Sequence, residues 1–533
     1  MQNCLQIYDS TLRDGAQAEG IAFSVEDKLA IAQRLDGLGV HYIEGGWPNP
    51  TNTKDLAFFI RAKEFEWRSA RIAAFGSTRR TSATPEHDAV LNTLLAAETE
   101  TVAIFGKSWD LHVREVLRTS LDENLKLIRE SVAYLKGRGR EVIYDAEHFF
   151  DGYKENPGHA MATILAAQEG GADIIVLCDT NGGALTSEVY DIVGAAKKEM
   201  QVPFGIHAHN DSGMGVSNTI AAVELGAAQV QGTINGYGER CGNANLCAVI
   251  PTLELKLKRR CIGREKLREL MEVSRFVSEI SNVYHDHRQP YVGESAFAHK
   301  GGTHVDGVIK TPRSFEHVDP EMVGNSRRFL VSDQSGGGAI VNKLQRLRPG
   351  LKKNDPVVAA VLAAVKEKEG EGYVFEAAEG SFEMLARKAM GIFRDPFELI
   401  SYRTVVLKDD RQMQVEAIVK LRVKGEIQHT VAEGDGPVNA LDRALRRALE
   451  GAYPSLKEVH LEDYKVRVLS SSDGTAAKVR VLIESSDGKD AWGTVGVSEN
   501  LIEASWIALV DSLSYKLLKD SIGAAEKTSS GPN

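Results

Sequence analysis

Two histidines separated by one residue, His207 and His209, form a pair able to hold a metal ion. They stand at the end of an apolar run that begins at Phe204 and predicts a β-strand. Side chains at positions i and i+2 of a strand point to the same face, so both imidazoles can bind one ion from one side. A His-x-His pair alone is a weak signal, and it needs an oxygen ligand from elsewhere in the chain.

Two oxygen-bearing side chains could complete such a site. Asp14 follows the first predicted strand, and Asn243 follows the eighth. Each has a structural alternative, because Asp14-Gly15 is a common turn dipeptide and an asparagine often caps a helix. Two imidazoles with one or two oxygens suit zinc, manganese, cobalt or magnesium, without choosing among these ions.

An acidic pair, Asp145 and Glu147, ends the fifth predicted strand. The strand period of two puts both carboxyl groups on one face, where either could act as a general base. Arg13, next to Asp14, would supply a fixed positive charge to oxygens that become negative during a reaction. The alternative for Arg13 is a salt bridge that holds Asp14 in place.

Short apolar runs alternate with amphipathic stretches over the first ~265 residues, the pattern of repeated βα units. Ser24 and Asp27 predict the start of the first helix, and Gly39 predicts its end. The eight predicted strands are Leu5–Tyr8, His41–Glu44, Arg71–Phe75, Thr101–Phe105, Glu141–Tyr144, Asp173–Cys178, Phe204–His207 and Gln229–Ile234. Eight strands with polar clusters after nearly every one favour an α/β fold of the TIM (β/α)8 type, with a doubly wound sheet as the alternative.

The rest of the chain changes character twice. Residues 266–400 read as a linker with small helical subdomains, and residues 401–520 as an α+β domain with an internal repeat. In that repeat Thr430-Val431-Ala432 aligns without a gap onto Thr494-Val495-Gly496, and each copy ends in a helix. Two similar units predict a pseudo-symmetric regulatory domain that forms a dimer and binds an effector, with plain structural duplication as the alternative. Residues 521–533 read as a flexible tail.

Composition narrows the class of protein. The chain has 533 residues and a formal net charge of -10 with both signs interspersed, which argues against a nucleic-acid partner. The first residues lack a basic stretch followed by an apolar one, so we expect no signal peptide, and no apolar run is long enough to predict a membrane span. Five cysteines without a C-x-x-C pair indicate reduced thiols, so we expect a cytoplasmic enzyme.

Three motifs resemble those of one enzyme family. The segment Asp9–Gln17 resembles the signature D-[ST]-T-L-R-D-G-x-Q of metal-dependent acyl-transferring barrel enzymes, and Gly238–Ala244 and Phe297–Gly307 match two further motifs. This group contains the 2-isopropylmalate, homocitrate and citramalate synthases and hydroxymethylglutaryl-CoA lyase. The resemblance implies a TIM barrel in which Asp14, His207, His209 and Asn243 are the metal ligands. The carboxy-terminal repeat is similar to the regulatory domain of the isopropylmalate and citramalate synthases.

The resemblance also implies roles for other residues. Glu147 rather than Asp145 falls on the catalytic acid of the family, and His304 falls on a histidine thought to enter the barrel of the partner subunit in a homodimer. Without the family, a local hydrogen bond would be the better interpretation of His304. The substrate-binding set is Thr180, where relatives bind the 2-oxo acid carboxylate, with Asp145, Glu44 and Gln17. A helix N-cap is the alternative for Thr180, and Glu44 is expected to hold Arg13 by an ion pair.

The implied reaction joins acetyl-CoA to a small 2-oxo acid. The segments Gly20–Lys28 and Tyr42–Pro48 resemble the branch of the family that uses pyruvate, which predicts isoleucine as the inhibitor. The alternatives are a 2-isopropylmalate synthase, a lyase or aldolase acting in the cleavage direction, and a barrel kept only as a ligand-binding regulator without catalysis. No residue pattern identifies the coenzyme A site.

Overall fold

The computed structural model describes residues 5–49, 53–330, 337–345, 347–409, 413–469 and 476–529. The chain divides into two compact units, each described by itself below. The first comprises residues 1–297 and 317–327, and the second comprises residues 298–316 and 328–533. The domain boundaries expected at residues 265, 400 and 520 stay predictions.

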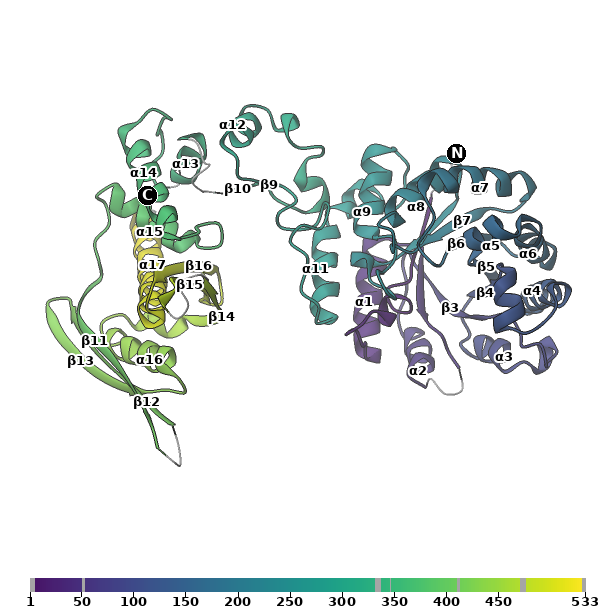
Figure 1. Cartoon of the computed structure of the whole chain (residues 1–533), viewed down its shortest axis with the longest axis horizontal. Coiled ribbons are helices and arrows are strands. Elements are labelled where there is room, and N and C mark those ends of the chain that lie inside the picture. Colours follow the sequence, from purple (N-terminus) through teal and green to yellow (C-terminus); the bar gives the residue numbers. More distant parts are fainter. Residues whose placement is uncertain are drawn as a thin grey trace. The chain divides into compact units, whose positions relative to one another are not determined.

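A closed barrel of eight strands forms the centre of the first unit (Figure 1). All eight predicted strands are present and run parallel, and β1 pairs with β8 through Gln6–Asp9 and Gln229–Gly232. That pairing closes the sheet, so the TIM barrel is confirmed and the doubly wound alternative is wrong. The strands are β1 (Gln6–Asp9), β2 (Tyr42–Gly46), β3 (Arg71–Ser77), β4 (Thr101–Lys107), β5 (Glu141–Glu147), β6 (Ile174–Asp179), β7 (Phe204–Ala208) and β8 (Gln229–Gly232).

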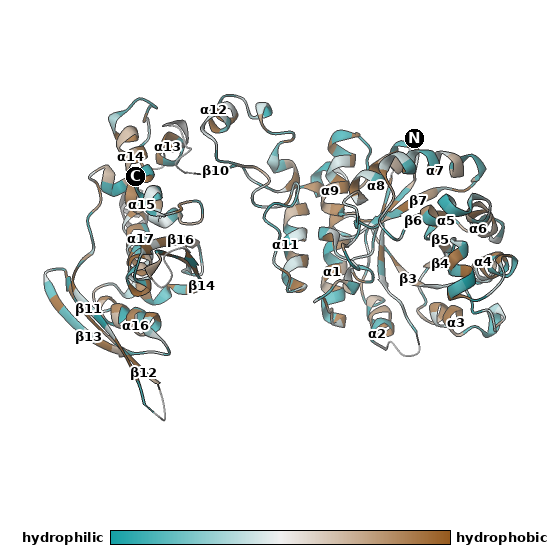
Figure 2. Ribbon diagram, viewed as in Figure 1, coloured by the Kyte–Doolittle hydropathy of each residue, from teal (hydrophilic) through white to brown (hydrophobic). Residues whose placement is uncertain are grey.

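Helices follow the strands and cover the outside of the barrel. The first begins as its sequence predicts, because Ser24 and Asp27 form a reciprocal capping box and Gly39 ends the helix in the left-handed conformation. Most barrel helices carry both teal and brown stretches in Figure 2, as amphipathic helices do. They are α1 (Val25–Leu38), α2 (Thr53–Ala62), α3 (Ala89–Ala96), α4 (Leu121–Gly137), α5 (Phe149–Glu155), α6 (Pro157–Gly170), α7 (Thr186–Glu199), α8 (Gly215–Glu224), α9 (Leu246–Pro251), α10 (Arg264–Leu267) and α11 (Leu270–Ile280).

Two separate hydrophobic clusters hold this unit together. The larger fills the layer between strands and helices, and the smaller fills the barrel interior with Tyr8, Tyr42, Phe75, Ile143 and Val176 among its members. Barrel strands therefore bury both faces and read as near-continuous apolar runs. Because the interior is packed with side chains, a polar active site is expected at the carboxyl ends of the strands.

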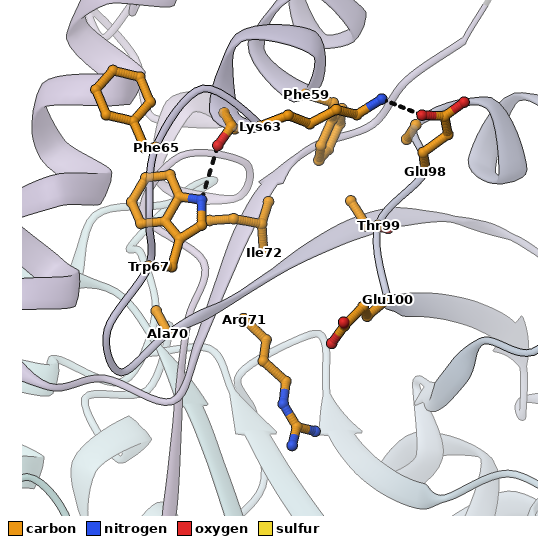
Figure 3. Close-up of a pocket in the computed structure, with 12 residues that line it drawn as sticks. Phe59, Lys63, Phe65, Trp67, Ala70, Arg71, Ile72, Glu98, Thr99 and Glu100 are labelled. Atoms are coloured by element: carbon orange, nitrogen blue, oxygen red, sulfur yellow. Dashed lines mark hydrogen bonds and ion pairs between the residues drawn. The ribbon is translucent and has the colours of Figure 1, made fainter.

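One hollow of about 360 Å³ lies at the amino-terminal ends of β3 and β4, away from the carboxyl ends where TIM barrels hold their active sites (Figure 3). Phe59, Phe65 and Trp67 form its apolar wall, and the Lys63–Glu98 ion pair lies at its edge. It contains none of the residues that the sequence singled out. In TIM-barrel enzymes the active site lies at the carboxyl ends of the strands, and the amino-terminal end contributes to stability. We therefore do not assign catalysis to this hollow.

The second unit contains the α-helices between residues 302 and 389 and both copies of the repeat, whereas the helix at Leu270–Ile280 of the expected linker belongs to the first unit. Each copy is a three-stranded antiparallel sheet followed by a helix, and Thr430 Oγ1 donates to Ala444 O at 2.7 Å as Thr494 Oγ1 donates to Ala508 O at 2.8 Å. These equivalent bonds confirm the repeat read from the sequence. The elements are β9 (Ala298–His299), α12 (Gly302–Lys310), β10 (Arg328–Phe329), α13 (Gly337–Leu344), α14 (Pro356–Glu371), α15 (Glu379–Ala389), β11 (Phe397–Lys408), β12 (Met413–Val423), β13 (Glu426–Glu433), α16 (Pro437–Leu449), β14 (His460–Val468), β15 (Val479–Ser486), β16 (Ala491–Ser498) and α17 (Leu501–Ser529).

The last helix, α17, continues to Ser529 and so includes residues 521–529 that the sequence assigns to a tail; residues 530–533 lie outside the described chain. Among the described residues, no helix combines the length and the apolar character needed to cross a membrane.

Candidate active site at the carboxyl ends of the barrel strands

A cavity of about 170 Å³ opens at the carboxyl ends of the barrel strands. Its lining includes eight of the eleven residues that the sequence singled out, and the other three are Glu44, Asn243 and His304. The lining residues are Arg13, Asp14, Gln17, Trp47, Phe75, Phe105, Asp145, Glu147, Cys178, Thr180, His207, His209 and Glu239.

Three of these residues form a possible metal site. Ligand atoms of Asp14, His207 and His209 all lie within 4.8 Å of one another, and all three residues are buried. Asp14 Oδ2 lies 3.9 Å from His207 Nε2 and 4.0 Å from His209 Nε2. They meet because β8 lies between β7 and β1, so strands far apart in sequence end at one mouth.

The protonation states of Asp14 and His209 suit a cation. Burial, and then the neighbouring His207, lower the pKa of His209 to about 4, so its imidazole is neutral at pH 7. Burial opposes ionisation of Asp14, but Arg13 and then the two histidines hold the pKa of that carboxyl well below its ordinary value. Neutral imidazoles and an ionised carboxylate are the forms that bind a metal.

Asn243, the expected fourth ligand, lies next to Asp14. Its Nδ2 donates to Asp14 Oδ1 at 2.8 Å and to Tyr237 O at 3.1 Å. Its Oδ1 is buried and has no hydrogen-bond partner among the described residues, an uncommon state for a buried amide oxygen. The approach depends on Gly238, where a Cβ atom would lie 2.1 Å from Asn243 Nδ2.

The helix-cap alternative for Asn243 is wrong, because Asn245 caps α9 instead. An unpaired amide oxygen, two imidazoles and a carboxylate together make a donor set that fits a divalent ion.

Arg13 lies between two carboxylates. It forms ion pairs with Asp14 at 2.8 Å and with Glu44, and its guanidinium lies 3.8 Å from the centre of the Phe75 ring. Glu44 is fully buried and also accepts hydrogen bonds from Tyr8 at 2.5 Å and Ser10 at 2.6 Å. The expected Glu44–Arg13 pair is therefore present, and it fixes the guanidinium at the cavity wall.

The two acidic residues of β5 have different surroundings. Burial, and then the nearby Glu44, raise the pKa of Asp145 to about 8, so Asp145 is a neutral acid at pH 7. Glu147 instead forms an ion pair with Lys107, its register partner on β4. An ionised Glu147 can accept a proton, whereas a protonated Asp145 can donate a hydrogen bond.

Thr180 and Gln17 both line the cavity. Thr180 Oγ1 accepts a hydrogen bond from His148 N at 2.9 Å, and the N-cap of α7 is Leu185, so the helix-cap alternative for Thr180 is wrong. Gln17 is exposed and also lines an adjoining hollow of about 340 Å³, together with Arg13 and Trp47.

His304 belongs to the second unit. It lies on α12, where its ring stacks on Phe315 with 4.3 Å between ring centres. Its expected entry into a barrel stays a prediction.

Comparison with known proteins gives the family. The "HMGL-like" family model matches residues 4–277, a "Homocitrate synthase post-HMGL domain-like" model matches residues 291–372, and a "LeuA allosteric (dimerisation) domain" model matches residues 376–517. A protein of Geobacter sulfurreducens named (R)-citramalate synthase is 54% identical over 97% of this chain and 98% of its own length. The chain belongs to the citramalate synthase family. A protein of Aquifex aeolicus, also named (R)-citramalate synthase, is 53% identical over 98% of this chain and 99% of its own length.

Other members of the wider group are more distant. A protein of Methanopyrus kandleri named probable 2-isopropylmalate synthase is 31% identical over 96% of this chain and 98% of its own length. The HMGL-like match spans every predicted site residue except His304, which falls within the post-HMGL match.

Sequence reasoning missed several residues that this family member places around the site. Lys107 pairs with Glu147, and Gln231 contacts both His207 and Asp145 from β8. Trp47, Phe75 and Phe105 form an aromatic wall. For Gln231 the sequence did contain a signal, the pattern Gln229-x-Gln231. Two amide side chains on one face of a buried strand cost free energy unless they are hydrogen-bonded, so they indicate polar partners inside the barrel.

Proposed function

We propose that this protein is a citramalate synthase that condenses acetyl-CoA with pyruvate to give (R)-citramalate and coenzyme A. The observation that carries the proposal is the Asp14, His207 and His209 cluster with Glu147 in the lining of the same cavity, in a chain so similar to proteins of that name. The metal-binding role of Asn243 and the catalytic roles of Arg13, Glu147 and His304 are part of this proposal.

The ligand set supports a divalent metal such as manganese, magnesium, zinc or cobalt. An ion held by Asp14, His207, His209 and Asn243 would polarise the keto group of pyruvate and neutralise charge on its oxygen. Thr180 lines the same cavity and offers its hydroxyl to the pyruvate carboxylate.

Glu147 is the proposed base. It takes a proton from the methyl group of the acetyl thioester, and that carbon attacks the keto carbon of pyruvate. As the new carbon–carbon bond forms, the keto oxygen gains negative charge beside the fixed guanidinium of Arg13 and then takes a proton, which we assign to His304 acting across a homodimer. Water then attacks the thioester carbonyl, the carbon–sulfur bond breaks, and coenzyme A leaves as the thiol.

The aromatic wall supports a small 2-oxo acid. Phe75 and Phe105 stack at 5.5 Å, and Trp47 meets them edge-on at 5.8 Å and 5.5 Å. These rings line the same cavity as the metal cluster, so they could bound the space for the side chain of the 2-oxo acid. Each extra methylene is worth only about 1–3 kcal/mol in an apolar pocket, so such a wall is enough to favour pyruvate over 2-oxoisovalerate.

The adjoining hollow supports a place for the coenzyme. It shares Arg13, Gln17 and Trp47 with the reaction cavity, and it also contains Lys54 and Asn49. Trp47 Nε1 is buried and has no hydrogen-bond partner in the described part of the chain, so it is free to donate to a carbonyl of the pantetheine arm.

The carboxy-terminal domain supports feedback regulation in a homodimer. It matches a family model described as allosteric and dimerising, and Val406, Leu407 and Val468 on its sheets are each at least half exposed. A second copy of the domain would cover such apolar strands. Isoleucine is the proposed inhibitor, because citramalate feeds its synthesis.

Thiol release from acetyl-CoA tests the proposal. The full chain is assayed with Mn²⁺ or Mg²⁺ and with pyruvate, 2-oxobutyrate, 2-oxoisovalerate or 2-oxoglutarate, and the product from pyruvate is resolved on a chiral column. Preference for pyruvate and formation of the (R) isomer would support the proposal. Preference for 2-oxoisovalerate would make the protein a 2-isopropylmalate synthase, and no release with any acid would overturn the synthase assignment.

A further inference from the structure

The second ring nitrogen of His207 has a side-chain partner. His207 Nδ1 lies 2.8 Å from Gln231 Oε1, and both side chains are buried in the barrel. The other nitrogen, Nε2, faces Asp14. An imidazole that binds a metal through one nitrogen needs its proton on the other, so the partner of Nδ1 decides which tautomer is present.

The orientation of the Gln231 amide is fixed from its other end. Gln231 Nε2 lies 3.2 Å from Asp145 Oδ1 and 3.3 Å from Gln229 Oε1. Gln231 Nε2 donates to both oxygens, which leaves the amide oxygen facing His207. Because an amide oxygen can only accept, the proton of the ring is on Nδ1 and the lone pair is on Nε2.

The second histidine of the pair lacks such a partner. His209 Nδ1 is buried, and no described residue forms a hydrogen bond with it. Among the described residues, orientation of the two-histidine pair therefore depends on the Gln231 contact. A fully buried glutamine is costly unless its amide is paired, and Gln231 makes all three of the contacts above.

We infer that Gln231 is a positioning residue that fixes His207 as the Nδ1–H tautomer and so presents Nε2 to a metal ion. This inference rests on the proposed metal centre. Partners of this kind typically change metal affinity by about 10–100-fold when they are removed.

Mn²⁺ binding to the full chain, stripped with a chelator and followed by electron paramagnetic resonance, tests the inference. Gln231→Met keeps the side-chain length but removes the acceptor, and it should weaken Mn²⁺ binding at least about tenfold. Gln231→Glu keeps an acceptor and should stay within about threefold of the unsubstituted protein. Gln289→Met is the matched control, because it alters another buried glutamine of the first unit that takes no part in these contacts, and it should also stay within about threefold.

A Gln231→Met protein that binds Mn²⁺ as tightly as the unsubstituted protein would overturn the inference. If that variant does not fold, ¹⁵N NMR of the metal-free unsubstituted protein still decides, with His207 assigned through His207→Gln. A proton on Nδ1 is expected, and a proton on Nε2 would overturn the inference. Failure of the unsubstituted protein to bind Mn²⁺ at all would instead overturn the metal centre, and this role of Gln231 with it.

Discussion

Lys107 and Glu147 are register partners at the carboxyl ends of β4 and β5, and their side chains form an ion pair in the barrel mouth. The carboxylate is three-quarters buried, at 22% exposure, so this pair is better protected from solvent than a surface salt bridge. Lys107 also lies near the Phe105 ring, with 5.2 Å from its Nζ to the ring centre. One lysine thus contacts both the proposed base and the aromatic wall.

Replacing this lysine should impair the chemical step more than substrate binding. Lys107→Met removes the contact that orients Glu147, and we expect kcat for citramalate formation to fall about tenfold or more, given the roughly 10²–10⁴-fold contribution of a general base. KM for pyruvate should change less than threefold. Lys107→Arg is the control and should keep most of the activity, whereas an unchanged kcat in Lys107→Met would remove Lys107 from the mechanism.

Variants that lack one of the proposed metal ligands should lose both the bound ion and the enzymatic activity. Asp14→Ala and His209→Ala each remove one member of the cluster, so bound metal measured by elemental analysis and thiol release should both fall by at least about 100-fold. His112→Gln is the control, since it changes another histidine of the first unit that is not in the cluster and should leave metal content unchanged. Full activity in either alanine variant would contradict the metal assignment.

Mixed dimers test whether His304 acts across a subunit boundary. A Glu147→Gln chain and a His304→Ala chain should each be nearly inactive alone. When they are mixed and exchanged, a dimer should contain one site with both residues intact, so activity should return to at most about a quarter to a half of the unsubstituted level. Differently tagged chains, purified in tandem, confirm mixing; mixed dimers without activity would place both residues in the same chain's site.

Asp145 should make stability depend on pH in a defined direction. Its pKa is about 8 in the folded protein and about 3.9 in an unfolded chain, so between these values the native state holds one more proton. The free energy of unfolding then falls as pH rises, at up to about 1.4 kcal/mol per pH unit. Asp145→Asn lacks this dependence, so in metal-free protein its advantage over the unsubstituted chain should grow from pH 5 to pH 8 in urea titrations.

Asp179 is the matched control for that measurement. Burial raises its pKa to about 6 only, so the corresponding advantage of Asp179→Asn should stop growing near pH 6. An Asp145→Asn advantage that does not change with pH would show that Asp145 is already ionised in the native state.

How far the sequence could predict this site depends on the range of the interactions involved. The strand that carries His207 and His209 is visible in a local apolar pattern, and the family motifs add Asp14 and Asn243. The Lys107–Glu147 pair is not visible, because it depends on the register between two strands. Gln231 breaks the apolar pattern of a buried strand, and only the packed barrel shows which groups it contacts.

The aromatic wall gives the last prediction. Phe105 stacks on Phe75 and meets Trp47 edge-on, so Phe105→Ala should remove one side of the wall and enlarge the cavity. The ratio of kcat/KM for 2-oxoisovalerate to that for pyruvate should rise about tenfold or more, because two extra methyl groups would find space that is now filled. Phe65→Ala is the control: it removes a phenylalanine from the hollow at the other end of the barrel and should leave the ratio unchanged. If Phe105→Ala lowers activity on every 2-oxo acid by the same factor, Phe105 supports the site without selecting the substrate, and selection must lie with other residues of the cavity.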